Sequence, residues 1–182
     1  FEIFYATYVA CYFRSTHVRI IWTVKNKRGY IDKIDFKSDT KITKNMRIFP
    51  SKLSKSQQID LLGEIEKALD VAPLFVPKMP RTGKPFSVRM SNLGPLGWVS
   101  DQKNGYRYQA FHPETNDPWP KMPAILTDLW AELTNYPFPP EACLVNYYAP
   151  GAKMGMHQDK DEEDFDAPVL SVSLGDRARF RL

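Results

Sequence analysis

The sequence predicts a mainly β fold with flanking helices, in a chain of 182 residues whose length fits one domain. Aromatic residues make up 13% of the chain and 15 prolines outnumber 9 glycines, a composition typical of strands joined by stiff loops. Helical spacing of apolar residues occurs in only two stretches, 54–72 and 123–135. The hydrophobic share of 43% and the charged share of 25% exclude wholesale disorder and low-complexity classes.

Two helices are expected. The first begins at a capping box, since Ser54 is followed three residues later by Gln57, and it ends before Pro73. Its buried face is expected to consist of Ile59, Leu62, Ile65 and Leu69. The second begins at Pro123 and continues to about Asn135. Its apolar stripe consists of Ile125, Leu126, Leu129, Trp130 and Leu133.

The remaining patterned segments read as strands. They cover residues 18–24, 86–90, 105–108, 142–148 and 169–174. A link rich in glycine and proline at 94–97 leads to Trp98, and Gly175 closes the last strand. No internal repeat is visible.

The first 45 residues are expected to lie outside the functional domain, which we place at 46–182. They are basic and show little regular hydrophobic patterning, whereas more regular patterning begins at Met46. The opening stretch 1–13 is apolar but contains Glu2, follows no basic residue and is too short to span a bilayer, so we expect neither a signal peptide nor a membrane anchor. Two cysteines, Cys11 and Cys143, are too few for a disulfide scaffold, which indicates a reducing, cytoplasmic location.

Charge is distributed unevenly along the chain. Residues 1–110 hold 19 Lys and Arg against 9 Asp and Glu, while residues 111–182 hold 6 against 12. A basic half that faces a polyanion and an acidic half that holds a cation would suit an enzyme acting on nucleic acid with a bound metal. The alternative is that these charges form solvated faces.

The segment 146–161 contains the candidate metal ligands and anion-binding residues. Residues two apart on a strand share a face, so His157 and Asp159 point the same way and supply two corners of a facial triad that binds Fe(II). The same spacing places Asn146 and Tyr148 on one face, where an amide and a phenol can hydrogen-bond a small anion beside the metal. Taken alone, a His and an Asp two apart are a weak signal, because surface residues produce the same pattern.

The surrounding motifs resemble the AlkB family of Fe(II)- and 2-oxoglutarate-dependent dioxygenases. The resemblance covers about residues 52–182 and is carried by N-x-Y-x-P-G at 146–151, H-x-D-x-D at 157–161 and P-V-L-S-V-S-L-G at 168–175. Upstream it includes N-L-G-P-L-G-W at 92–98, G-Y-R-Y at 105–108 and H-P-E-T-N-D-P-W-P at 112–120, which are similar to the bacterial alkylated-DNA repair type. It implies a double-stranded β-helix, a jelly roll of the cupin type, that is incomplete at the C-terminus of this chain.

The resemblance also implies the site residues. His157 and Asp159 match the metal ligands, with no catalytic residue beyond them, and Asn146 and Tyr148 match residues that bind 2-oxoglutarate. The residues that match the substrate pocket are Trp98, Tyr106, Tyr108 and Asp161. The implied reaction uses Fe(II), 2-oxoglutarate and O₂ to demethylate 1-methyladenine and 3-methylcytosine in DNA, releasing formaldehyde, succinate and CO₂.

The implied partners are alkylated single- or double-stranded DNA, with RNA as an alternative, and no membrane; a monomer is expected. Basic residues around the pocket are candidates for phosphate contacts: Lys78, Arg81, Lys84, Arg89, Lys103 and Arg107. For each of them separately, a solvated surface position is the competing interpretation. Two rival functions remain open: an RNA or protein demethylase on the same scaffold, and a catalytically inactive nucleic-acid-binding module.

The chain departs from the family pattern in its ligand set. The family needs a second His ligand and an Arg for 2-oxoglutarate downstream of the last strand, and neither is matched here. His17 lies in the unmatched region and His112 in a loop upstream of the core strands, so neither is expected to substitute. We therefore expect the 182-residue chain alone to hold iron weakly and to be inactive, and the full-length enzyme to be active.

Three further residues are expected to have structural roles. Trp130 is assigned to the core, Trp119 to a rigid anchor between two prolines, and Cys143 to small buried packing that alternates with the functional face.

Overall fold

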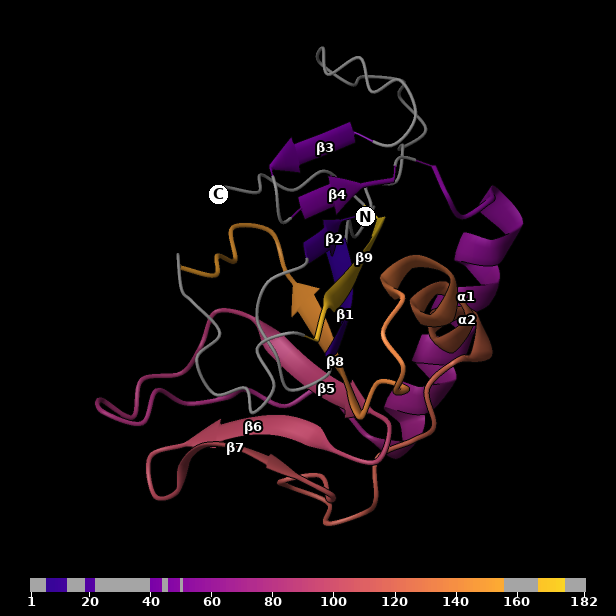
Figure 1. Cartoon of the computed structure of the whole chain (residues 1–182). Coiled ribbons are helices and arrows are strands. Elements are labelled where there is room, and N and C mark those ends of the chain that lie inside the picture. The colour runs from indigo at the N-terminus through magenta and orange to yellow at the C-terminus, as the bar shows by residue number, and fades with distance from the viewer. Residues whose placement is uncertain are drawn as a thin grey trace.

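A computed structural model describes residues 6–12, 19–21, 40–43, 46–49, 51–155 and 167–175. Within these residues a central β-sheet has two helices, side by side, along one face and a separate β-hairpin at one end (Figure 1). The expected class, mainly β with flanking helices, is confirmed. No helix among the described residues is long and apolar enough to cross a membrane.

The sheet has seven described strands. In sheet order they are β3 (Thr40–Thr43), β4 (Met46–Ile48), β2 (Arg19–Ile21), β9 (Val169–Gly175), β1 (Ala6–Tyr12), β8 (Ala142–Tyr148) and β5 (Arg89–Leu93). Strand β1 is antiparallel to β8 and β9, and β5 is antiparallel to β8. Strand β2 runs parallel to both β4 and β9. The expected strands at 142–148 and 169–174 are confirmed as β8 and β9, whereas the strand expected at 86–90 lies three residues later.

The first 45 residues contribute strands to this sheet, whereas we expected them to lie outside the domain. The backbone of Ala6 pairs with Tyr148 and Gly175, and that of Tyr12 pairs with Ala142 and Val169. The physical reason is that β8 and β9 run parallel with one strand position between them, and an extended segment placed there uses the backbone groups of both edges. Such long-range pairing leaves no local pattern in the sequence.

Helix α1 (Lys55–Val71) begins as the sequence predicts. The Ser54 side chain accepts a hydrogen bond from the Gln57 amide (3.2 Å), and the Gln57 side chain accepts one from the Ser54 amide (2.8 Å). The expected buried face is partly wrong, because Ile59 and Leu62 are 61% and 39% exposed. Ile65 is fully buried and Leu69 packs against the core, as expected, and Leu61 is fully buried although it was not expected on this face. Two apolar lines run along this helix, and the sheet covers only one of them.

Helix α2 (Ala124–Thr134) buries the predicted stripe. The buried residues are Leu126, Leu129, Trp130 and Leu133, and Ile125 packs against the same cluster. This cluster joins both helices to the inner side chains of β8 and β9, among them Cys143, Val145 and Val172. The core positions expected for Trp130 and Cys143 are confirmed.

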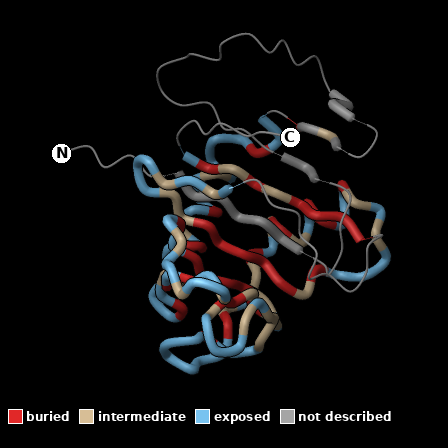
Figure 2. Tube along the Cα trace, turned by 90° about the vertical axis from the view of Figure 1, so that its left-hand side faces the viewer, coloured by how far each residue is buried: buried red, intermediate tan, exposed pale blue. Residues whose placement is uncertain are grey.

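The hairpin of β6 (Gly97–Asp101) and β7 (Gly105–Gln109) rests on a second apolar cluster. That cluster contains Ala72, Phe75, Val88, Met90, Val99, Trp119 and Leu144. Trp119, expected as a loop anchor, is buried there and donates its indole N–H to the Gln109 carbonyl (2.8 Å). The buried segments run through the centre of the molecule, flanked by exposed loops (Figure 2). The sheet therefore separates two cores, one on its helical face and one toward the hairpin.

Gly97 is required where the hairpin approaches this second cluster. A Cβ at this position would lie 2.4 Å from Trp119 Cε2 and 2.7 Å from Asn92 Cβ. Gly97→Ala is therefore expected to destabilise the protein by about 1–3 kcal/mol, the usual cost of overpacking. Gly63, in α1, has open space around its Cβ position, so Gly63→Ala is expected to stabilise by about 0.5–1 kcal/mol. Urea denaturation measures both changes, and equal effects of the two substitutions would contradict this account.

Candidate functional site

Strand β8 presents alternate residues to the two faces of the sheet. Cys143 and Val145 belong to the helical core, while Leu144 belongs to the cluster under the hairpin and Tyr148 packs against that cluster. Asn146 lies opposite Met90 of β5, another residue of the hairpin cluster. The predicted shared face of Asn146 and Tyr148 is thus confirmed; Leu144 also lies on it, and it is the face opposite the helices.

Asn146 carries an unsatisfied polar atom. The residue is only 5% exposed, and its Oδ1 has no hydrogen-bond partner among the described residues. A buried polar atom without a partner costs about 1–3 kcal/mol, so such atoms are uncommon outside ligand sites. Rotation of an asparagine carboxamide about the Cβ–Cγ bond exchanges Oδ1 and Nδ2, so the same position can hold either an acceptor or two N–H donors. Asn146 therefore fits a small anionic ligand such as 2-oxoglutarate.

Tyr148 lies two residues further along the same strand. Its hydroxyl donates to Met154 Sδ at 3.7 Å, and a thioether sulfur is a weak acceptor. A carboxylate oxygen would be a stronger acceptor for the same hydroxyl. The side chain of Tyr148 thus also fits an anionic ligand.

The loop after β8 is tied to the segment that precedes β5. Ser87 Oγ donates to the Lys153 carbonyl (2.7 Å) and accepts from the Lys153 amide (3.0 Å). This double contact joins residues 66 positions apart in sequence. This contact was not predicted, because no sequence pattern indicates which residue a serine in a loop will contact.

The aromatic residues predicted for a substrate pocket gather on the hairpin. The Trp98 and Tyr106 rings are stacked, with centroids 5.5 Å apart and planes 24° apart, and Phe86 lies 6.2 Å from Trp98. Tyr108 pairs directly opposite Trp98 across the two strands. Trp98 and Tyr108 are half-buried and Tyr106 is 46% exposed. The hairpin therefore carries a partly accessible aromatic surface.

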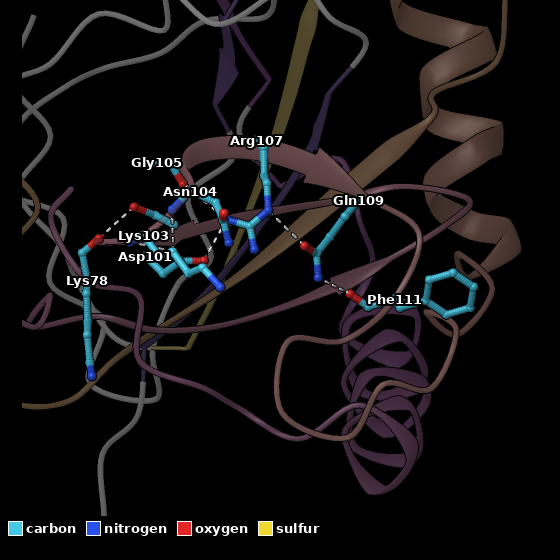
Figure 3. A network of polar contacts seen from close by, with 9 residues as sticks. Lys78, Asp101, Lys103, Asn104, Gly105, Arg107, Gln109 and Phe111 are labelled. Carbon is cyan, nitrogen blue, oxygen red and sulfur yellow. Dashed lines mark hydrogen bonds and ion pairs between the residues drawn. The ribbon is translucent and has the colours of Figure 1, made fainter.

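Polar residues stiffen the hairpin on its other face (Figure 3). Asp101 Oδ1 accepts from the amides of Lys103 (2.9 Å) and Asn104 (2.7 Å), and Asp101 Oδ2 pairs with Arg107 Nη1 (2.6 Å). Arg107 Nε also donates to Gln109 Oε1 (3.0 Å). The guanidinium of Arg107, a candidate for phosphate contact, is thus engaged within the hairpin.

These contacts lower the pKa of Asp101 below its ordinary value of 3.8. The hydrogen bond from the Asn104 amide is the largest cause and the Arg107 side chain the next. A carboxyl group with a lowered pKa stabilises the fold above its ordinary pKa, and the contribution is lost as the pH falls through the folded value. The difference in melting temperature between the wild type and Asp101→Asn is therefore expected to stay constant above about pH 5 and to shrink below pH 3.8. The difference itself is small, below about 1 kcal/mol, because the pair is partly exposed. Thermal melts over this pH range measure it, and a difference that grew in acid would contradict the assignment.

The other basic candidates remain on the surface. Lys78, Arg81, Lys84, Arg89 and Lys103 are exposed. Arg89 lies over the Tyr147 ring, 4.5 Å from its centroid. These side chains can reach an anionic polymer.

His112 has a structural role. It is 1% exposed, its Nε2 lies 2.8 Å from the Pro73 carbonyl, and its Nδ1 accepts from the amides of Glu114 and Thr115 (3.1 and 3.2 Å). Both ring nitrogens are therefore occupied, in agreement with the expectation that His112 is not a metal ligand.

The predicted metal ligands His157 and Asp159, together with Asp161, lie outside the described residues. Within the described part of the chain, no three side chains of His, Cys, Asp or Glu converge in a way that could hold a metal ion. The assignments of all three residues stay predictions. The described structure brings together Asn146 with Tyr148 and, on the hairpin, Trp98 with Tyr106 and Tyr108.

The sequence profile of the 2OG-Fe(II) oxygenase superfamily matches residues 45–182, and the chain belongs to that superfamily. Within it the AlkB resemblance is confirmed. An alpha-ketoglutarate-dependent dioxygenase AlkB homolog of Caulobacter vibrioides is 50% identical over 135 residues, which cover 74% of this chain and 60% of the relative. Alpha-ketoglutarate-dependent dioxygenase AlkB of Escherichia coli is 50% identical over 103 residues, 54% of this chain and 47% of the relative.

A more distant relative is named for a different nucleic acid. It is an N6-methyladenosine RNA demethylase ALKBH of Cryphonectria parasitica, 34% identical over 110 residues, which cover 59% of this chain and 46% of the relative. The chain thus spans about half to three fifths of the length of these three relatives.

Proposed function

We propose that the protein containing this chain is an Fe(II)- and 2-oxoglutarate-dependent dioxygenase that demethylates alkylated bases in DNA. The observation that carries the proposal is the buried Asn146 amide, with no partner for its Oδ1 among the described residues, in a member of the 2OG-Fe(II) oxygenase superfamily. The two bacterial relatives, both named AlkB dioxygenases and both 50% identical, support the same activity.

The co-substrate is bound by β8 in this proposal. Asn146 turns its amide so that Nδ2 donates to 2-oxoglutarate, and the Tyr148 hydroxyl exchanges Met154 Sδ for a carboxylate oxygen. His157 and Asp159 are the proposed protein ligands of the iron. Iron, when bound, supplies the oxidation of an N-methyl group by O₂ at the expense of 2-oxoglutarate.

The base is recognised by the hairpin in this proposal. Trp98, Tyr106 and Tyr108 offer π-faces, and Asp161 offers a carboxylate. A methylated base such as 1-methyladenine is cationic, which strengthens its attraction to a π-face and to a carboxylate. Stacking also suits a base that has left the duplex, since flipping costs least for a damaged or single-stranded base.

The remaining assignments belong to the same proposal. The catalytic domain is 46–182, a double-stranded β-helix of the cupin type, and the superfamily match from residue 45 supports this boundary. Strands β1 and β2, from the first 45 residues, lie within its sheet on either side of β9. We also propose a cytoplasmic monomer with no membrane partner.

Two other functions compete with DNA demethylation. The similarity to the RNA demethylase of Cryphonectria parasitica favours RNA as the alternative substrate on the same scaffold. A catalytically inactive nucleic-acid-binding module would use the exposed basic residues around the hairpin and perform no chemistry.

Formaldehyde release decides between these functions. The protein containing this chain is supplied with Fe(II), 2-oxoglutarate and one of three substrates: single-stranded DNA with 1-methyladenine, RNA of the same sequence and lesion, or a methylated peptide. Fastest release from DNA is expected. Faster release from RNA or from the peptide would identify an RNA or a protein demethylase. Salt-sensitive DNA binding without formaldehyde would identify a binding module.

A further inference from the structure

Asn92, in β5, makes a two-point contact with the backbone of Trp98. Its Nδ2 donates to the Trp98 carbonyl (3.0 Å), and its Oδ1 accepts from the Trp98 amide (3.0 Å). Asn92 is completely buried. The carboxamide thus pairs with the second residue of β6 as a neighbouring strand would pair with it.

The chain between these two residues is built for this contact. Gly94 has φ +103°, a conformation that favours glycine, and its amide donates to the Pro120 carbonyl (2.7 Å). Gly97 allows the backbone before Trp98 to approach Asn92, since a Cβ there would lie 2.7 Å from Asn92 Cβ. Residues 93–97 therefore place the Asn92 carboxamide directly opposite the amide and carbonyl of Trp98.

The indole of Trp98 depends on that backbone. Its ring is half-buried between Phe86 and Tyr106, and the indole N–H donates no hydrogen bond within the described part of the chain. Packing and the position of the Cα therefore set the plane of the ring. A shift at the Cα moves the far edge of a long, rigid side chain, so the backbone contact controls the stacking surface.

We infer that Asn92 is a positioning residue that sets the Trp98 indole for stacking on the alkylated base, and so contributes to the preference for a methylated over an unmethylated base. The inference rests on the proposed function, in which Trp98 contacts the base. Asn92 itself touches no substrate in this account. It acts only through the two hydrogen bonds to Trp98.

Two substitutions in the same strand separate positioning from stability. Asn92→Asp keeps the shape of the side chain but replaces the Nδ2 donor with an acceptor that faces the Trp98 carbonyl. Ser91→Ala is the matched control: Ser91 is equally buried, but its hydroxyl donates to the Ala72 carbonyl (2.7 Å) and not to Trp98. Both variants lose one buried hydrogen bond.

The readout is the ratio of dissociation constants for two short labelled single-stranded DNAs, one with adenine and one with 1-methyladenine. It is measured by fluorescence anisotropy with the protein containing this chain. Asn92→Asp is expected to reduce this preference about tenfold, within the range that stacking contributes per base, and Ser91→Ala to leave it unchanged. A general loss of stability would lower the melting temperature of both variants. It would not change the ratio of dissociation constants in Asn92→Asp alone.

The possible outcomes are distinguishable. If the wild type shows no preference for 1-methyladenine, the proposed substrate is wrong. If Trp98→Ala removes the preference but Asn92→Asp keeps it, only the inference about Asn92 is overturned. If Asn92→Asp does not fold, Asn92→Ser decides by the same criteria, because its hydroxyl is too short to span both backbone groups and adds no charge.

Discussion

Asn146→Leu is expected to stabilise the ligand-free chain and to weaken 2-oxoglutarate binding by about 10- to 100-fold. Leucine has a similar volume and removes a buried oxygen that has no partner within the described structure, which relieves about 1–3 kcal/mol. A chain of this size gains about 2–4 °C in melting temperature per kcal/mol. The loss of affinity follows because a hydrogen bond to a charged carboxylate contributes about 1.5–3 kcal/mol.

The matched control is Asn92→Leu. Asn92 is also a fully buried asparagine on the same sheet, but both ends of its amide are bonded to Trp98. Its replacement is therefore expected to lower the melting temperature, opposite in sign to Asn146→Leu. Calorimetric melts measure stability, and titration of the protein containing this chain with 2-oxoglutarate in the presence of Mn(II) measures affinity. A lower melting temperature for Asn146→Leu with unchanged affinity would show that Asn146 is structural.

Trp98→Ala is expected to weaken binding of single-stranded DNA carrying 1-methyladenine by about 10- to 100-fold, because stacking on an aromatic side chain contributes about 1–3 kcal/mol per base. Affinity for 2-oxoglutarate is expected to stay unchanged, since the co-substrate is assigned to β8. Trp98→Phe keeps an aromatic face and is expected to recover most of the binding. Fluorescence anisotropy with labelled oligonucleotides measures these differences.

Phe111→Ala is the control for Trp98. Phe111 is a 50% exposed aromatic residue just beyond β7, and it contributes to the polar network of the hairpin only through its carbonyl, which accepts from Gln109 Nε2 (2.5 Å; Figure 3). Removal of the Phe111 ring is expected to leave the binding of single-stranded DNA unchanged, both with 1-methyladenine and with adenine. Equal losses in the two alanine variants would mean that the hairpin binds DNA through general apolar contact rather than through the Trp98 surface.

Local signals predicted the helices well because the relevant contacts are close in sequence. The capping box at Ser54 and Gln57 is formed by residues three apart, and the stripe on α2 follows directly from helical spacing. The buried face of α1 was predicted only in part: Ile65 is buried as expected, but Leu61 is buried in place of Ile59 and Leu62, and contact with the sheet decides between them. Helical periodicity alone does not identify the side that meets a partner.

Long-range pairing explains the other differences. The position of β1 between β8 and β9 depends on strand edges more than 100 residues away in sequence. The pairing of Arg107 with Asp101 depends on the turn that folds β7 back on β6, so a residue expected to meet phosphate is engaged within the hairpin. The shared face of Asn146 and Tyr148 was predictable, because alternation along one strand is a local property. The roles of His157 and Asp159 stay predictions.

The central claim is that the protein containing this chain couples 2-oxoglutarate turnover to base demethylation. The most direct measurement is the ratio of formaldehyde to succinate released with single-stranded DNA that carries 1-methyladenine, compared with the same DNA without the lesion. The account predicts equal amounts of the two products with the lesion and neither product above background without it. Succinate that forms without formaldehyde, or DNA binding with neither product, would contradict it.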